Sequence, residues 1–144
     1  MDPLGASASL VTLIDLVVKT IKAVNRTIQS YREAPLELTQ LKLQIEGLKS
    51  QVVLFRYLQE AVACDELQLK NIEVSLTLDH FLRQSVFLLS SVCDHFEKCS
   101  LARRDTPRGR LTWALRDTSK IKVWENSVRK QSTELTNLLL LINL

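Results

Sequence analysis

The sequence has 144 residues, of which 46% are hydrophobic, and its formal net charge is +3 at pH 7. This length and apolar content suit one globular domain with its own core. Three glycines and three prolines are too few for the tight turns of a sheet protein. We therefore expect a single all-α domain over residues 1–144.

The first segment, residues 4–28, is predicted to form an amphipathic helix. Apolar residues at spacings of four and three share one helical face: Leu10, Ile14, Val17, Ile21, Val24 and Ile28. The opposite side carries charges at the same spacing: Asp15, Lys19, Lys22 and Arg26. The uncharged stretch before Asp15 is shorter than the roughly 20 residues that a membrane-spanning helix needs. The apolar face must be buried in the chain's own bundle, against a partner's helices or in the interfacial layer of a membrane.

The second segment is predicted to be a helix that begins at Pro35, a residue suited to the first helical position. Its apolar residues alternate at spacings of three and four, which indicates a narrow heptad-like seam: Leu38, Leu41, Ile45, Leu48, Val52 and Phe55. Charged residues at helical neighbour spacing, such as Lys42 and Glu46, are interpreted as solvated surface pairs.

A capping box formed by Asp65 and Gln68 predicts the start of a third helix. The residues from Ile72 to Leu78 alternate between apolar and polar, which taken alone is a strand pattern. We favour a helix, because no partner strand exists and the helical period returns without a breaker. The expected core residues of this helix are Leu78, Leu82, Leu89, Val92 and Phe96.

The stretch from Leu101 to Gly109 is the one credible loop, and a short helix near residues 108–117 is expected after it. The last helix should bury one apolar stripe: Ile121, Trp124, Val128, Leu135, Leu138 and Ile142. The complete prediction is an antiparallel bundle of four long helices plus this short extra helix. Because the sequence stops among leucines, we expect it to be the N-terminal part of a longer protein.

The residues that carry enzyme chemistry are scarce. His80 and His95 are the only histidines, and there is no glycine-rich phosphate loop, nucleophile elbow or paired Cys-x-x-Cys motif. His95 and Cys99 share a helix face, but Cys93 points elsewhere, so no tetrahedral zinc site is evident. We expect no catalytic residue, cofactor or metal, with reduced thiols and a surface histidine.

Basic residues gather after residue 100, whereas acidic residues predominate between residues 65 and 99. The favoured interpretation is a solvated loop that complements the acidic third segment. The functional alternative is contact with anionic lipid headgroups through Arg103, Arg104, Arg108 and Arg110. Nucleic acid is disfavoured because aromatic residues are few and no binding motif is present.

The large aromatic residues are interpreted as core anchors, because they lie in register with the leucine stripes. These are Phe55, Phe96, Trp113 and Trp124. The alternative for the two tryptophans is a membrane interface, where indole rings prefer the headgroup level.

Three segments together resemble a known family. They are the opening MDPLGASASLVTLIDLVVKTIKAV, the REAP turn from Arg32 to Pro35, and RLTWALRDTSKIK from Arg110 to Lys122. Over nearly its whole length the chain resembles the HeLo-like N-terminal domain of fungal STAND and ankyrin-type proteins. The resemblance implies an effector or adaptor module ahead of a nucleotide-binding switch or a repeat array.

Related HeLo domains act in fungal cell death and self-recognition, and they are similar to the helical killer domains of necroptotic pseudokinases. By position, the first helix would be the element that engages the membrane. The charges at Asp15, Lys19 and Lys22 distinguish it from a strongly hydrophobic killer helix.

Two functions remain open from the sequence. One is a cytoplasmic, non-enzymatic signalling effector of an NLR-like protein, which oligomerises and associates with an anionic membrane on activation. The other is a scaffold without membrane activity, in which leftover apolar edges of the second and fourth long helices pair with a second copy, a related helical domain or a partner helix. Neither involves a nucleic acid or a small-molecule substrate.

Overall fold

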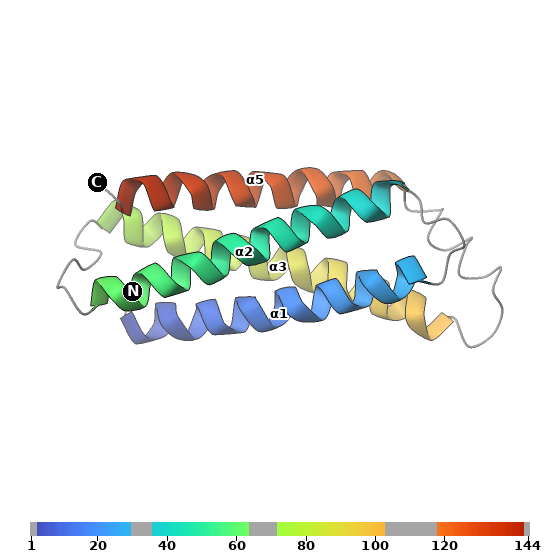
Figure 1. Ribbon diagram of the computed structural model, residues 1–144, viewed down its shortest axis with the longest axis horizontal. Helices are drawn as coiled ribbons and strands as arrows, with labels where there is room; N and C mark the ends of the chain where they lie inside the picture. Colours follow the sequence, from blue (N-terminus) through green and yellow to red (C-terminus); the bar gives the residue numbers. More distant parts are fainter. Residues whose placement is uncertain (1–2, 30–35, 64–71, 103–117, 143–144) are drawn as a thin grey trace.

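A computed structural model describes residues 3–29, 36–63, 72–102 and 118–142, and each of these ranges is one helix (Figure 1). The helices are α1 (Pro3–Gln29), α2 (Leu36–Ala63), α3 (Ile72–Ala102) and α5 (Thr118–Ile142). The prediction of an all-α fold is confirmed for these residues, which contain no strand. The predicted short helix near residues 108–117 lies outside the described residues.

The four described helices pack side by side as a bundle in which each helix contacts two of the others. α1 lies against α2 and α3, and α5 lies against the same two helices. The colour gradient of Figure 1 shows α1 and α3 running in one direction, and α2 and α5 running in the other. Consecutive helices are therefore antiparallel, but each helix also has one parallel neighbour, because α1 packs on α3 and α2 packs on α5.

The α2 seam lies in the centre of the core, as its spacing of three and four predicts. All six of its apolar residues are buried: Leu38, Leu41, Ile45, Leu48, Val52 and Phe55. This regular pattern keeps one narrow buried stripe from Leu38 to Phe55 on the helix that packs against α1 and α5.

α3 is helical from Ile72 onward, which confirms the helix and excludes the strand that the alternation around Val74 also allowed. Its predicted core residues Leu78, Leu82, Leu89, Val92 and Phe96 are buried. The same face also buries Phe81 and Ser85, which the sequence reasoning did not include.

The buried face of α1 is rotated relative to the predicted stripe. Leu10, Val17 and Val24 are fully buried, whereas Ile14, Ile21 and Ile28 are half-buried and pack at the edge of the core. Four other residues of α1 are also buried on this face: Leu13, Thr20, Ala23 and Thr27. The predicted stripe did not include the two threonines, whose methyl groups pack well in a core when the hydroxyls are hydrogen-bonded.

On α5 the buried apolar residues are Ile121, Val128, Leu135 and Leu138. Trp124 is half-buried and packs against the core, to which the buried Phe55 and Phe96 belong. Trp113 and the side chain of Ile142 lie outside the described residues.

Candidate interaction surfaces

The buried face of α1 satisfies its own polar groups. Thr20 Oγ1 donates a hydrogen bond of 2.7 Å to the Leu16 carbonyl oxygen one turn earlier, and Thr27 Oγ1 donates one of 3.2 Å to the Ala23 carbonyl oxygen. The longer contact between Thr20 Oγ1 and the Leu89 carbonyl oxygen of α3 measures 3.4 Å. Because both hydroxyls are bonded within α1, the helix carries these hydrogen-bond partners with it wherever its apolar face is buried.

The opposite face of α1 is exposed and basic. It presents three cationic side chains and one carboxylate: Lys19, Lys22, Arg26 and Asp15. α1 is therefore amphipathic in the structure, with its apolar side in the bundle and an excess of positive charge on the outside.

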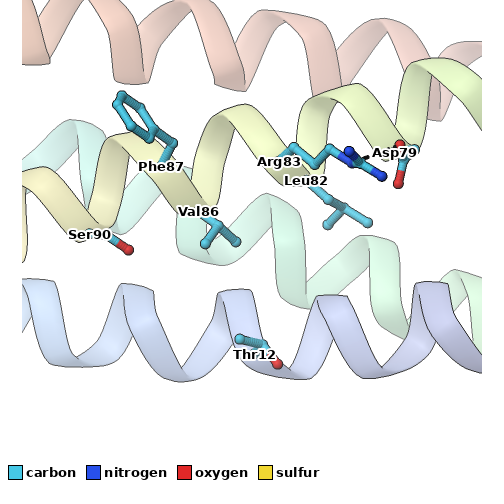
Figure 2. Close-up of a pocket in the computed structure, with 7 residues that line it drawn as sticks. All are labelled: Thr12, Asp79, Leu82, Arg83, Val86, Phe87 and Ser90. Atoms are coloured by element: carbon cyan, nitrogen blue, oxygen red, sulfur yellow. Dashed lines mark ion pairs between the residues drawn. The ribbon is translucent and has the colours of Figure 1, made fainter.

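An open groove of about 660 Å³ lies between α1 and α3 (Figure 2). Leu82 and Val86 project from α3 toward α1 and form its apolar floor, while Thr12 of α1 and Ser90 of α3 lie at its polar rim. An ion pair of 3.0 Å between Arg83 Nε and Asp79 Oδ2 lies on the same side of α3. These two charges neutralise each other, so the groove presents apolar surface rather than a charged ligand site.

Phe87 lies on the outer ridge of α3 and points away from α1 in Figure 2. It is 76% exposed. It also lines a smaller hollow toward Trp124 of α5, so one exposed aromatic ring borders grooves on both sides of α3.

α2 carries a second apolar stripe on the side opposite its core seam. We name it the α2 outer stripe, and its members are Leu36, Leu43, Gly47, Ser50, Leu54 and Tyr57. All six residues are exposed, and the leucines are between half and two-thirds exposed. A methyl group added at Gly47 would meet no atom within 4 Å, so the middle of the stripe is open. The sequence indicated leftover apolar edges on this helix, but the small residues in the middle hid the continuous stripe.

Direct polar contacts join α5 to both of its neighbours. Ser85 Oγ donates a buried hydrogen bond of 3.0 Å to Gln131 Oε1 between α3 and α5. Nearer the surface, Gln51 Nε2 donates one of 2.9 Å to Thr136 Oγ1 between α2 and α5. Directional bonds of this kind fix the register of helices that apolar packing alone would leave free to slide.

Cys93 is buried on α3 beside α1. Burial raises the pKa of its thiol above the ordinary value of 9.0, and the nearby Glu97 carboxylate raises the pKa further. Its Sγ lies 3.5 Å from Glu97 Oε1, to which the thiol donates. A buried thiol that stays protonated is a poor nucleophile.

His95 is buried, and the expectation of a surface histidine was wrong. Its ring stands edge-on to Phe96 at a centroid distance of 5.2 Å and to Trp124 at 5.0 Å. The α3–α5 contact covers the ring, and neighbour spacing within one helix cannot reveal such coverage. His80 is exposed. Within the described ranges no three His, Cys, Asp or Glu side chains cluster closely enough to hold a metal ion.

The predicted lipid contacts Arg103, Arg104, Arg108 and Arg110 lie outside the described residues. Among the helices that the structure describes, none has an apolar stretch sufficient to cross a bilayer. Comparison of the chain with protein-family models, with curated proteins and with solved structures found no match.

Proposed function

We propose that this bundle is a non-enzymatic signalling or effector domain of a fungal NLR-like protein, cytoplasmic at rest. On activation it would oligomerise and turn the apolar face of α1 toward a membrane surface, in programmed cell death or a self/non-self response. The resemblance of its opening, its REAP motif and its RLTWALRDTSKIK segment to the HeLo-like family supports this proposal.

The observation that carries the proposal is that α1 is amphipathic and bonds its buried hydroxyl groups within its own helix. Fully burying an apolar side chain contributes about 1.5–3 kcal/mol, so the three buried and three half-buried residues of the predicted stripe represent on the order of 10 kcal/mol. The interfacial layer of a membrane can supply a similar driving force. The hydroxyls of Thr20 and Thr27 are bonded within α1, so moving the helix leaves neither of them without its acceptor.

The exposed side of α1 fits the same proposal. With its apolar face in the lipid interface, Lys19 and Lys22 would lie at headgroup level, where each basic residue contributes about 1 kcal/mol on an anionic surface. A receptor, or the association of several copies, that loosens the bundle would shift α1 from the core to the lipid interface, because burial in either place has a comparable free energy.

The second candidate function is a scaffold without membrane activity. The α2 outer stripe favours it, because this exposed apolar surface is available while α1 remains in the core. Helices with an apolar face commonly dock on a partner helix or groove.

Vesicle co-sedimentation of the full chain separates these functions. The test compares the unmodified chain with K19E/K22E on anionic phosphatidylserine vesicles and on neutral phosphatidylcholine vesicles. The matched control is K120E/K122E, which makes the same charge change at exposed residues of α5, the helix diagonal to α1.

The proposal predicts binding to anionic vesicles only, with an affinity loss of about thirtyfold or more in K19E/K22E and a much smaller loss in the control. Equal losses in the two variants, or no binding of the unmodified chain to anionic vesicles, would contradict the membrane function. The scaffold would then be the remaining candidate.

A further inference from the structure

We propose that two copies of this chain associate through their α2 outer stripes, packed antiparallel about the point midway between Gly47 and Ser50. The proposal deepens the self-association in the proposed function and rests on it in that respect. It does not require α1 to leave the core, because the stripe lies on the face of α2 opposite the seam.

The first argument is that the stripe has the same spacing in both directions. From Leu43 to Leu54 the steps are four, three and four residues, with the small residues Gly47 and Ser50 in the middle. An antiparallel second copy therefore places Leu43 opposite its Leu54, and Gly47 opposite its Ser50. A surface that matches its own reverse is what a two-fold symmetric interface requires, because both copies use the same patch.

The second argument is close approach. Helix axes pack 8–10 Å apart, depending on the side chains at the crossing point. The space over Gly47 is open, and Ser50 is small and exposed. Small residues at the crossing allow the flanking leucines of each copy to reach the other helix. Leu43 is 59% exposed and Leu54 is 50% exposed, so both have apolar surface to bury.

The third argument is charge. One edge of the stripe carries Lys42, Glu46, Lys49 and the exposed Val53, and the other edge carries Gln40, Gln44 and Gln51. When two helices pack antiparallel, each edge meets the same edge of the second copy in reverse order. Glu46, which pairs with Lys42 of its own helix at 3.8 Å, then also comes within reach of Lys49 of the other copy, which gives two symmetric opposite-charge contacts.

These charges also select the occupant and its direction. A parallel second copy would place the charged edge against the glutamine edge and forgo both ion pairs. An anionic membrane would meet an edge in which Glu46 already neutralises Lys42 at 3.8 Å, so Lys49 alone adds positive charge and the attraction to a negative surface is weak. A second copy in antiparallel orientation is the occupant that matches this face.

Sedimentation equilibrium of the full chain tests the inference. The inference predicts a monomer–dimer equilibrium in which L43E raises the Kd of the dimer at least tenfold. The control is V123E, which makes the same change at an exposed apolar residue of α5 and leaves the Kd within about threefold. All of these side chains are exposed, so circular dichroism and the Tm should show that each variant folds.

Charge exchange tests the pairing directly. E46K places like charges together across the interface and should weaken the dimer, whereas E46K/K49E restores opposite charges and should recover most of the affinity. A chain that stays monomeric near 1 mM would overturn the inference. So would a dimer that L43E does not affect, or one that E46K/K49E weakens as much as E46K.

Vesicle binding measured on the same samples separates this inference from the proposed function. If the chain binds anionic vesicles but never dimerises, only the α2 interface is refuted. If the chain dimerises through α2 without binding vesicles, only the membrane function is refuted.

Discussion

Ser85 and Gln131 form a buried polar tie between α3 and α5: the Ser85 hydroxyl donates to Gln131 Oε1 at 3.0 Å. Ser85 is fully buried, and Gln131 is nearly so. Both residues lie among apolar residues on the buried faces of their helices, so their bond specifies how α3 and α5 align.

Replacing only Ser85 should cost more than replacing both partners. S85A leaves the Gln131 side chain buried without this donor, and we expect a loss of about 1–3 kcal/mol in the free energy of unfolding. S85A/Q131L removes the second polar group and should recover much of that loss. Urea denaturation of the two variants measures this, and a double variant that is less stable than S85A would refute the pairing.

Thr20 should be replaceable by valine without loss of stability. Its hydroxyl donates to the Leu16 carbonyl of its own helix, and that carbonyl keeps its backbone partner in a helix. T20V adds a methyl group to the core, so we expect a change between zero and about 1 kcal/mol of added stability. Thermal unfolding measures it.

The same variant bears on the proposed function. If α1 leaves the bundle to reach a membrane, the valine side chain is buried in the lipid interface as well as in the core, so T20V should bind anionic vesicles about as well as the unmodified chain. T20V that is more stable yet binds vesicles at least about tenfold less well would mean that this face of α1 does not enter the lipid, and would count against release of α1.

The Cys93 thiol should make stability fall in alkaline solution. Its pKa is raised in the folded state, mainly by burial, so the unfolded chain loses this proton at a lower pH than the folded chain. Above about pH 9 the unfolded state therefore binds fewer protons, and the free energy of unfolding decreases as pH rises. More than about one unit below that pH, the thiol is protonated in both states and contributes no slope.

C93A is the control for this effect, because tyrosine and lysine residues also titrate in alkaline solution. Urea midpoints measured from pH 8 to about 10 should decline more steeply for the unmodified chain than for C93A. Parallel curves would mean that burial does not hold the proton on Cys93.

Phe55 and Tyr57 provide a matched pair on α2, two residues apart and on opposite faces. Phe55 is 2% exposed and Tyr57 is 70% exposed. F55A should cost about 3–5 kcal/mol because it leaves a cavity, whereas Y57A should change stability by no more than about 0.5 kcal/mol. Chemical denaturation checks both, and similar losses would contradict the orientation of α2.

The sequence predicts α2 best, because its seam keeps one strict spacing from Leu38 to Phe55 and every member is apolar. α1 is predicted less well. Thr20 and Thr27 occupy core positions but count as polar, which shifted the expected stripe toward Ile14, Ile21 and Ile28. A side chain that satisfies its hydroxyl on its own backbone cannot be recognised from periodicity alone.

The interhelical features were the hardest to predict. His95 is buried because Trp124 of α5 covers it, and the pairing of α1 with the parallel α3 places Cys93 beside Thr20. These contacts depend on which helices are neighbours, and the pattern within one helix does not encode that choice. The outer stripe of α2 was visible as leftover apolar residues, but its two-fold spacing depends on the middle pair Gly47 and Ser50.

The most direct test of α1 release uses Cys93 as a reporter, because this thiol is buried on α3 where α1 covers it. In a C64S/C99S variant, its rate of modification by a small water-soluble thiol reagent is measured without vesicles, with neutral vesicles and with anionic vesicles. Release of α1 predicts slow modification in the first two conditions and a rate at least about tenfold higher on anionic vesicles. A chain that binds anionic vesicles while Cys93 stays as slow to react as in solution would contradict the account, because the bundle would have docked with α1 still in place.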